Sequence, residues 1–218
     1  MNLRTIRSTM HTAALCGAVA LLATGCNKKA DNTMNFKNAV DTYYSAHPAC
    51  LWPDSVKFPV QADTSDTSKT TGYDALVDQG LLTRTTVEKP KLIISSKQVN
   101  NYDLSSNGRS VWTVDVTQPG FGNFCYGHRK VTSIDSSTPT TSAVGATTQI
   151  TYHYALADAP AWATAAETQN AYPQLHADVS GPQTGHTTLT NTSNGWQVTG
   201  AEPNPSNPAT PADGKIVE

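Results

Sequence analysis

A strictly alternating segment in the second half of the chain constrains the fold most. In QITYHYAL, residues 149–156, the large apolar and aromatic side chains fall on one face of an extended strand: Ile150, Tyr152, Tyr154 and Leu156. Thr151 and His153 fall on the other face. Successive side chains of a strand point to opposite faces, so the segment predicts a strand with one buried face.

Two Asn-Gly pairs and a long β-rich run predict the remaining strands. Around Asn107-Gly108, a three-residue turn with a left-handed Gly108 would gather five large side chains on one face: Tyr102, Leu104, Trp112, Val114 and Val116. A two-residue turn would separate them, so burial favours the longer turn. A two-residue turn at Asn194-Gly195 aligns Leu189 with Trp196 and Val198. A further strand is expected over 122–134.

Three segments have the signals of helices. Residues 34–46 carry an apolar stripe formed by Phe36, Val40 and either Tyr43 or Tyr44, with Asn32 or Thr33 as the cap. A second, short helix is expected from a Thr71–Asp74 capping box to a left-handed Gly80, after a polar loop at 61–72. A third is expected over 160–170, with Pro160 in the first position and Pro173 beyond its end.

These elements predict an α+β fold. It has two N-terminal helices, an antiparallel β-sheet of about five to six strands, and one further helix inserted before the last hairpin. Residues 201–218 contain four prolines and few apolar side chains, which predicts a disordered tail. The expected organisation is a signal peptide at 1–25, a lipidated Cys and tether at 26–33, a single domain at 34–200, and the tail.

The N-terminal segment indicates export. Arg4 and Arg7 precede an apolar run, 13–23, that is too short to span a bilayer as a helix, which needs roughly 20 residues. The stretch Leu22-Ala23-Thr24-Gly25-Cys26 resembles the lipobox of bacterial lipoproteins, with Ala23 where that family usually has Leu. The resemblance implies cleavage before Cys26 and acylation of Cys26. An ordinary signal peptide that contains a Cys is the alternative.

The lipobox resemblance also implies a location. In that family an Asp after the acylated Cys favours the inner membrane, and this chain has Asn27 there. The resemblance therefore implies a protein anchored to the outer membrane through lipid and facing the periplasm. Removing Arg4 and Arg7 leaves 13 basic and 17 acidic groups, a net charge of −4. This mildly acidic balance argues against a nucleic-acid partner.

The cysteine count predicts one disulfide. Cys16 lies in the segment that would be removed, and Cys26 would carry the lipid. Cys50 and Cys125 remain, in a compartment that permits disulfides. A bridge between them would close a loop of about 75 residues and contribute roughly 4 kcal/mol in the chain-entropy model. Two buried free thiols are the alternative.

The densest aromatic and polar cluster is the candidate ligand site. It combines two segments of the predicted sheet: Tyr126, His128 and Arg129 with Tyr152, His153 and Tyr154. On a concave sheet face these residues could bind a sugar, a peptide or an apolar ligand. The alternative is that Tyr152 and Tyr154 belong to the core, as their alignment with Ile150 and Leu156 favours.

Candidates for catalysis and metal binding are sparse. His128 and His153 lie on strands that are expected to be neighbours, so they could meet and bind a transition metal; isolated histidines on a polar face are the favoured alternative. Asp115 and Asp135 could serve as an acid–base pair, but solvated or loop-capping carboxylates are favoured. The sequence has no G-x-S-x-G, S-x-x-K, H-E-x-x-H or C-x-x-C motif, and we expect no metal and no cofactor.

Two functions are consistent with this sequence. The favoured one is a membrane-anchored envelope lipoprotein that acts as a non-catalytic binding or assembly-support module for an envelope protein partner. The alternative is a small-ligand-binding domain or weakly marked hydrolase that uses a concave sheet face near His128 and His153. A sheet face filled by apolar side chains would favour the first, and an open cleft the second.

The end of the domain also resembles a known group. The span 149–199 is similar to the later part of small exported cystatin-like or NTF2-like domains, which often close with a strand of the form G-W-x-V, here Gly195 to Val198. The resemblance covers about a quarter of the chain, and it carries no function across.

Overall fold

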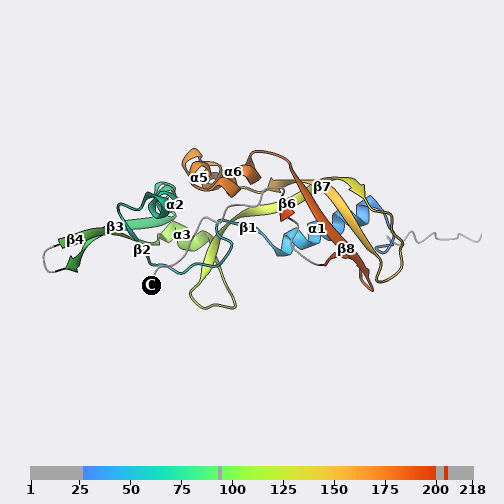
Figure 1. The fold of residues 1–218 in the computed structure, drawn as a ribbon, viewed down its shortest axis with the longest axis horizontal. Helices are drawn as coiled ribbons and strands as arrows, with labels where there is room; N and C mark the ends of the chain where they lie inside the picture. The colour runs from blue at the N-terminus through green and yellow to red at the C-terminus, as the bar shows by residue number, and fades with distance from the viewer. Residues whose placement is uncertain (1–26, 93–94, 200–203, 206–218) are drawn as a thin grey trace, which may run out of the picture.

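The computed structural model describes residues 27–92, 95–199 and 204–205 of the chain. Cys26, the predicted signal peptide and most of the predicted tail lie outside these residues. The molecule is elongated, with the long strands following its length (Figure 1). None of the helices in the described part combines the length and apolar character that crossing a bilayer requires.

The strands form two antiparallel sheets. The larger has seven strands: β1 (Ala49–Cys50), β5 (Trp112–Val114), β6 (Gly122–Ser137), β7 (Thr147–Ala157), β8 (Gln183–Thr192), β9 (Gly195–Val198) and β10 (Asn204–Pro205). The smaller has three: β2 (Val60–Asp63), β3 (Leu82–Leu92) and β4 (Ser95–Leu104). The predicted α+β class and its antiparallel sheet are confirmed, and the smaller sheet is an addition that the sequence did not predict. We call the larger sheet with its helix α1 the body, and the β2–β4–β3 sheet the arm.

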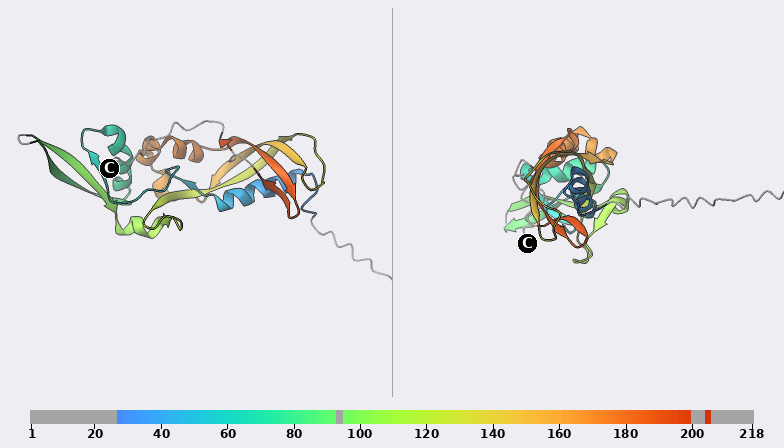
Figure 2. Two further views of the ribbon diagram at one scale, coloured as in Figure 1. Left: turned by 60° about the horizontal axis from the view of Figure 1, so that its bottom comes forward. Right: turned by 90° about the vertical axis from the view of Figure 1, so that its right-hand side faces the viewer.

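The helix α1 (Thr33–Ala46) fills the inside of the curled sheet of the body. The side chain of Asn32 caps it by accepting a hydrogen bond from the backbone N–H of Asn35 at 2.9 Å. Its buried stripe packs against β6–β9: Phe36, Ala39, Val40 and Tyr44. Viewed end-on, the sheet wraps around this helix (Figure 2). The predicted helix and its apolar face are confirmed.

The alternation in β7 is confirmed by its burial. Ile150, Tyr152 and Tyr154 are at most 3% exposed and form one core with α1. The last hairpin has the predicted facing, with Leu189 opposite Val198, although its two-residue turn is Ser193-Asn194 and not Asn194-Gly195. Gly195 has φ +104°, and a Cβ there would lie 2.8 Å from the Lys28 carbonyl oxygen.

A second core, the junction core, joins the body to the arm. Trp52 lies at its centre, and the centroids of five other rings lie 6.0–6.4 Å from its own: Phe58, Tyr73, Trp112, Phe124 and Tyr172. It is covered by α2 (Thr67–Asp78) and by three short helices, α4 (Ala161–Thr164), α5 (Ala166–Ala171) and α6 (Pro173–Val179). Figure 1 shows α5 and α6 over the middle of the molecule, between α2 and the body.

The predicted hairpin at Asn107-Gly108 is wrong. The segment forms a helix, α3 (Ser106–Val111), because the hydroxyl of Ser105 accepts a hydrogen bond from the Gly108 N–H at 2.8 Å and caps it. Gly108 is not left-handed; it packs so tightly that a Cβ would lie 1.9 Å from the Leu81 carbonyl oxygen. Trp112 then pairs with Phe124 on β6, so its ring packs against β6 and not against the strand that precedes the turn.

The second and third helices also differ from their predicted bounds. α2 begins at Thr67, so Thr71 is inside it and its hydroxyl donates to the Thr67 carbonyl at 2.7 Å instead of forming a capping box. The predicted polar loop at 61–72 is largely β2 and the start of α2, while Gly80 is left-handed as expected, with φ +69°. The third helix divides at Ala165, which is extended, and Pro173 begins α6 instead of following the last helix.

Candidate functional site

The sheet face that carries the candidate ligand site is occupied by α1. Tyr152 and Tyr154 point into the core of the body, and the hydroxyls of Tyr44 and Tyr152 lie 2.9 Å apart. Burial raises the pKa of Tyr152 to about 12, so both groups stay neutral at physiological pH. The two tyrosines of β7 are therefore core residues, as the alternative interpretation of the sequence held.

Arg129 closes the end of this core next to α6. Its guanidinium Nη2 donates to Asp178 Oδ2 at 2.7 Å, and the Arg129 and Asp178 side chains are 17% and 0% exposed. The guanidinium carbon lies 5.9 Å from the centre of the Tyr44 ring and 5.8 Å from that of Tyr154. Burial alone would lower the pKa of Arg129, but the charge of Asp178 outweighs it and the pKa is raised. The guanidinium is therefore permanently charged and held between aromatic faces.

Asp178 accepts hydrogen bonds from three side chains, Arg129 and Tyr126 on β6 and Gln174 on its own helix. The hydroxyl of Tyr126 on β6 donates to Oδ2 at 2.8 Å, and Gln174 Nε2 donates to Oδ1 at 3.2 Å. Burial and the neighbouring carboxylate raise the pKa of Tyr126, so its proton stays on the hydroxyl. Buried charges of opposite sign are tolerated where further hydrogen bonds satisfy them, and this group fits that description. Arg129, Asp178 and Tyr126 thus join the helical segment to the sheet.

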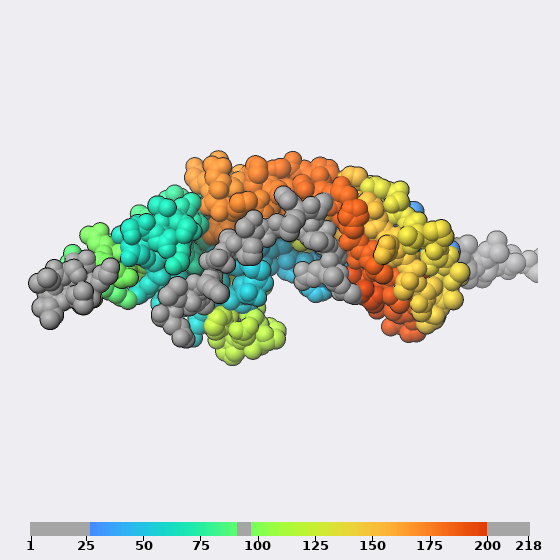
Figure 3. Space-filling view, in the orientation of Figure 1, coloured from blue at the N-terminus to red at the C-terminus, as the bar shows by residue number. Residues whose placement is uncertain are grey.

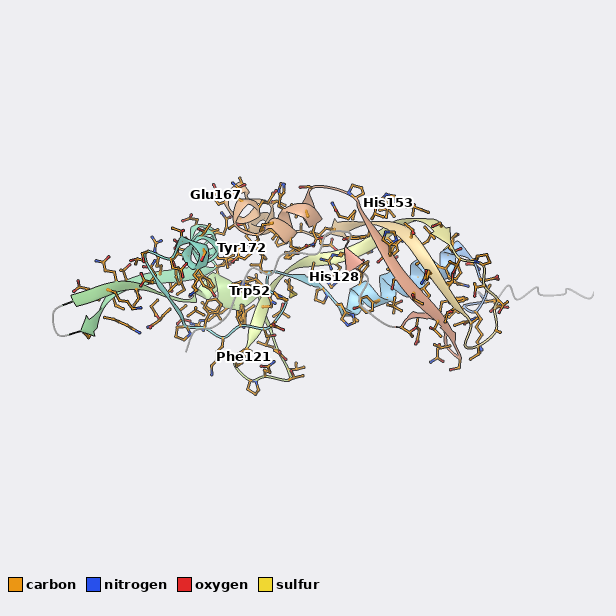
Figure 4. The ribbon with its side chains drawn as sticks, viewed as in Figure 1. Trp52, Phe121, His128, His153, Glu167 and Tyr172 are labelled. Carbon is orange, nitrogen blue, oxygen red and sulfur yellow. A yellow bond between two sulfur atoms is a disulfide. The ribbon has the colours of Figure 1, made fainter. Side chains whose placement is uncertain are left out.

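The two candidate histidines do not meet. His128 lies opposite Ala157 in the β6–β7 ladder, and His153 lies opposite Ser133. Ala157 lies four positions after His153 in β7, which is roughly 13 Å along a strand. Figure 4 shows the two side chains apart. The shared His128–His153 metal site is therefore wrong, since two ligands of one transition metal must each come within about 2.1 Å of it.

Each histidine has its own partner. His153 Nδ1 lies 2.7 Å from Asp135 Oδ2, and its Nε2 lies 3.3 Å from the Thr184 hydroxyl. This contact with His153 is the main cause that lowers the pKa of Asp135. His128 Nδ1 lies 3.5 Å from the Tyr44 carbonyl oxygen, a long contact at the end of α1. In the described part of the chain, no three His, Cys, Asp or Glu side chains gather as a metal site would require.

Asp115 caps a loop, as favoured from the sequence. Its Oδ1 accepts from the Thr117 hydroxyl at 2.6 Å and from the Thr117 N–H at 2.8 Å. The Thr117 hydroxyl is the main cause that lowers the pKa of Asp115. Asp115 and Asp135 each have a different local partner, so the pattern is that of two separate structural carboxylates.

Cys50 and Cys125 lie next to each other on neighbouring strands. Cys50 of β1 lies opposite Cys125 of β6, and their sulfur atoms are 2.06 Å apart, at bonding distance. The pair connects the segment after α1 to the longest strand of the sheet, next to the junction core. The sequence predicted these partners by elimination, and the structure places them together.

Asp178, the partner of Arg129, was not predicted from the sequence as a site residue. Asp178 lies in α6, which begins at Pro173, the residue expected to lie beyond the end of the third helix. Proline is also common at the first position of a helix, which is its place in α6. That signal would have predicted the helix, with Gln174 and Asp178 one turn apart, but not the contact with Arg129.

A polar hollow lies where the chain enters the body. It has a volume of about 480 Å³ and is lined by Asn27, Lys28, Lys29, Ser193 and Asn194. The predicted tether is fastened here, because Asn191 Nδ2 donates to the Lys29 carbonyl at 3.1 Å and Trp196 Nε1 donates to that of Ala30 at 3.1 Å. Asn27 is thereby held at the β8–β9 turn, at the end of the molecule opposite the arm (Figure 1).

Comparison with protein-family models, with curated proteins and with solved structures finds no match to this chain.

Proposed function

We propose that the protein is an envelope lipoprotein, anchored to the outer membrane through Cys26 and facing the periplasm, that acts as a non-catalytic binding or assembly-support module. The observation that carries the proposal is the filled sheet. α1 occupies the face on which the alternative function requires an open cleft, and Tyr152 and Tyr154 are buried there. Arg129 forms an ion pair with Asp178 and contacts two aromatic rings, so we assign it a structural role in the core.

The fastened tether supports the membrane attachment. Cys26 directly precedes Asn27, and residues 29 and 30 are bonded to β8 and β9. An acyl anchor on Cys26 would therefore hold the β8–β9 end of the body against the bilayer, with little slack between lipid and protein. Lys28 and Lys29, which line the hollow at that end, would face the lipid head groups, where anionic lipids attract basic residues.

Two variants test this proposal in a deletion strain. Cys26→Ala should remove the acyl mass from membrane-extracted protein, release the chain from the membrane and fail to complement. The double variant His128→Ala with His153→Ala should fold, stay anchored and complement fully, because neither side chain belongs to a binding site in the proposal. A wild-type chain without acyl mass would refute the anchor.

The double variant separates the two functions. If it folds and localises normally but fails like the deletion, the histidines act in ligand binding or catalysis, and the non-catalytic proposal is wrong. A matched control is His176→Ala with His186→Ala, which removes two exposed histidines from α6 and β8.

A further inference from the structure

The outer edge of the arm is long and uncovered. Every residue of β3 from 83 to 90 is exposed, and within the described part of the chain β3 pairs only with β4. Figure 3 shows the described part of the arm at one end of the particle, beside α2. An edge strand presents a row of backbone N–H and C=O groups to any strand that approaches it. The charges along β3 indicate which strand that is.

Two opposite charges lie symmetrically about Thr86. Arg84 and Glu88 are each two residues from it, so all three side chains share one face of the arm. When two identical edge strands pair antiparallel about a two-fold axis through Thr86, Arg84 of each copy lies opposite Glu88 of the other. Val87, which is 41% exposed, then lies opposite Thr85. Opposite charges that face each other across a ladder stabilise the pair.

Other registers of the same edge lack this match. A two-fold axis at Arg84, Glu88 or Lys89 sets like charges directly opposite each other, which is destabilising. An axis at Thr85 puts Arg84 opposite Thr86, and an axis at Val87 puts it opposite Pro90. Between residues 84 and 89, only the register centred on Thr86 pairs opposite charges.

We propose that β3 pairs antiparallel with β3 of a second copy of this chain, with Thr86 on the two-fold axis, so that the two arms form one six-stranded sheet. Arg84 is oriented for this role, because Nη1 is held by Asp74 at 2.7 Å while the guanidinium carries further N–H donors. The two bodies lie at opposite ends of the joined arms. The proposal stands on the arm alone and does not depend on the lipid anchor.

Cysteine cross-linking of the full-length protein in intact cells tests the register. Thr86→Cys should give a disulfide-linked homodimer on mild oxidation, because each Thr86 faces itself. Thr85→Cys and Val87→Cys, expressed together with different tags, should cross-link to each other and only weakly to themselves. Thr132→Cys, an exposed threonine on β6, and the wild-type chain are the controls. The second pair is needed because the Thr86 hydroxyl also donates to Asn100 at 2.8 Å.

Charge reversal tests the pairing energy. Glu88→Arg places two arginines opposite each other at both ends of the register and should reduce the cross-linking yield about tenfold. Adding Arg84→Glu to Glu88→Arg restores opposite charges and should restore the yield. The proposal is overturned if Thr86→Cys links no better than Thr132→Cys, if Thr85→Cys links to itself as well as to Val87→Cys, or if the links join a different envelope protein.

Discussion

The body and the arm use the same antiparallel ladder but differ in what covers it. In the body, α1 lies inside the sheet and buries large aromatic side chains on β6–β9, including Tyr152, Tyr154 and Trp196. In the arm, β3 is exposed from residue 83 to residue 90, and the buried residues beyond Leu82 lie on β2 and β4: Ala62, Val99, Asn100 and Tyr102. The body therefore draws stability from apolar burial, and the arm chiefly from its backbone hydrogen bonds and its root.

This difference determines which groups each region can offer to a binding partner. In the body, α1 fills the concave face of the sheet. In the arm, the exposed edge retains backbone groups that another strand can bond. Natural edges are often protected by Lys and Pro, and β3 carries Lys89 and Pro90 toward its tip. These residues limit pairing near the tip and leave the segment around Thr86 as the accessible part.

The largest loss of stability is expected from a substitution in the body. Asp178→Ala leaves the Arg129 guanidinium buried without its carboxylate and removes the acceptor of the Tyr126 hydroxyl. We expect the free energy of unfolding to fall by about 3–5 kcal/mol, as for other broken buried pairs. Urea denaturation measures it.

A surface pair provides the control for Asp178→Ala. Arg109 and Asp103 lie 3.6 Å apart with side chains 60% and 42% exposed. Asp103→Ala should cost about 1 kcal/mol or less. Equal losses for the two variants would contradict the structural role that we give to Asp178.

The next largest loss of stability is expected when the Cys50–Cys125 bridge next to the junction core is removed. Cys50→Ser should lower the free energy of unfolding by about 2–5 kcal/mol, because the unfolded chain gains the freedom of a loop of about 75 residues. Non-reducing peptide mapping of protein from the envelope should find Cys50 joined to Cys125. Free thiols at both positions would disprove the bridge. Cys125→Ser is the matched variant and should show the same loss.

A smaller effect is expected at the root of the arm. The hydroxyl of Tyr102, which is 0% exposed, donates to Asp74 Oδ1 at 2.8 Å and accepts from Asn100 Nδ2 at 3.1 Å. Tyr102→Phe removes both bonds and should cost about 1–3 kcal/mol. Native-state hydrogen exchange should then accelerate in β3 and β4 but not in β7.

The matched substitution in the body is Tyr152→Phe, which removes the bond to Tyr44. It should accelerate exchange in β7 and α1 and leave the arm unchanged. If either substitution accelerates both regions equally, body and arm unfold as one cooperative unit, and the comparison fails.

The smallest effect on stability is expected at Asp135, on the surface of the body, and it depends on pH. The contact with His153 lowers the folded-state pKa of Asp135 below its usual value. A depressed carboxyl pKa contributes stability above the unfolded pKa of about 3.9, and this contribution is lost as the pH falls through the folded pKa. Asp135→Asn should therefore be less stable than the wild type at pH 6, and the difference should vanish in acid. Thermal unfolding at pH 6, 3 and 2 follows the difference between the two proteins, and a difference that does not shrink as the pH falls would rule out this linkage.

Several features of the fold could be predicted because their signals are local. The stripe of Phe36 and Val40 predicts α1, since helical spacing alone places those side chains on one face. The alternation through Ile150 and Tyr152 predicts β7 for the same reason. The pairing of Cys50 with Cys125 followed from counting, once export was inferred from the N-terminal segment. None of these features depends on which distant segment packs against the element.

The candidate site could be predicted only in part. Tyr126 and Arg129 were singled out as members of a candidate ligand cluster, but their partner Asp178 was not, because 49 residues separate it from Arg129 and no local pattern connects them. His128 and His153 were placed on adjacent strands, and only the register shows that they lie several residues apart. A register depends on bulges, such as the shifts after Val131 and Ile134, which alternation does not reveal.

By itself the sequence determined where the chain forms α1 and β7, which face of each is apolar, and which cysteines remain to pair. The tertiary structure decided between a hairpin and a helix at 105–111, because Gly108 packs against Leu81 and Trp112 finds Phe124 across a different strand. It also decided that α1 fills the sheet and that β3 stays uncovered. Periodicity fixes which side chains share a face, but burial depends on which distant segment reaches that face, and only the assembled chain settles it.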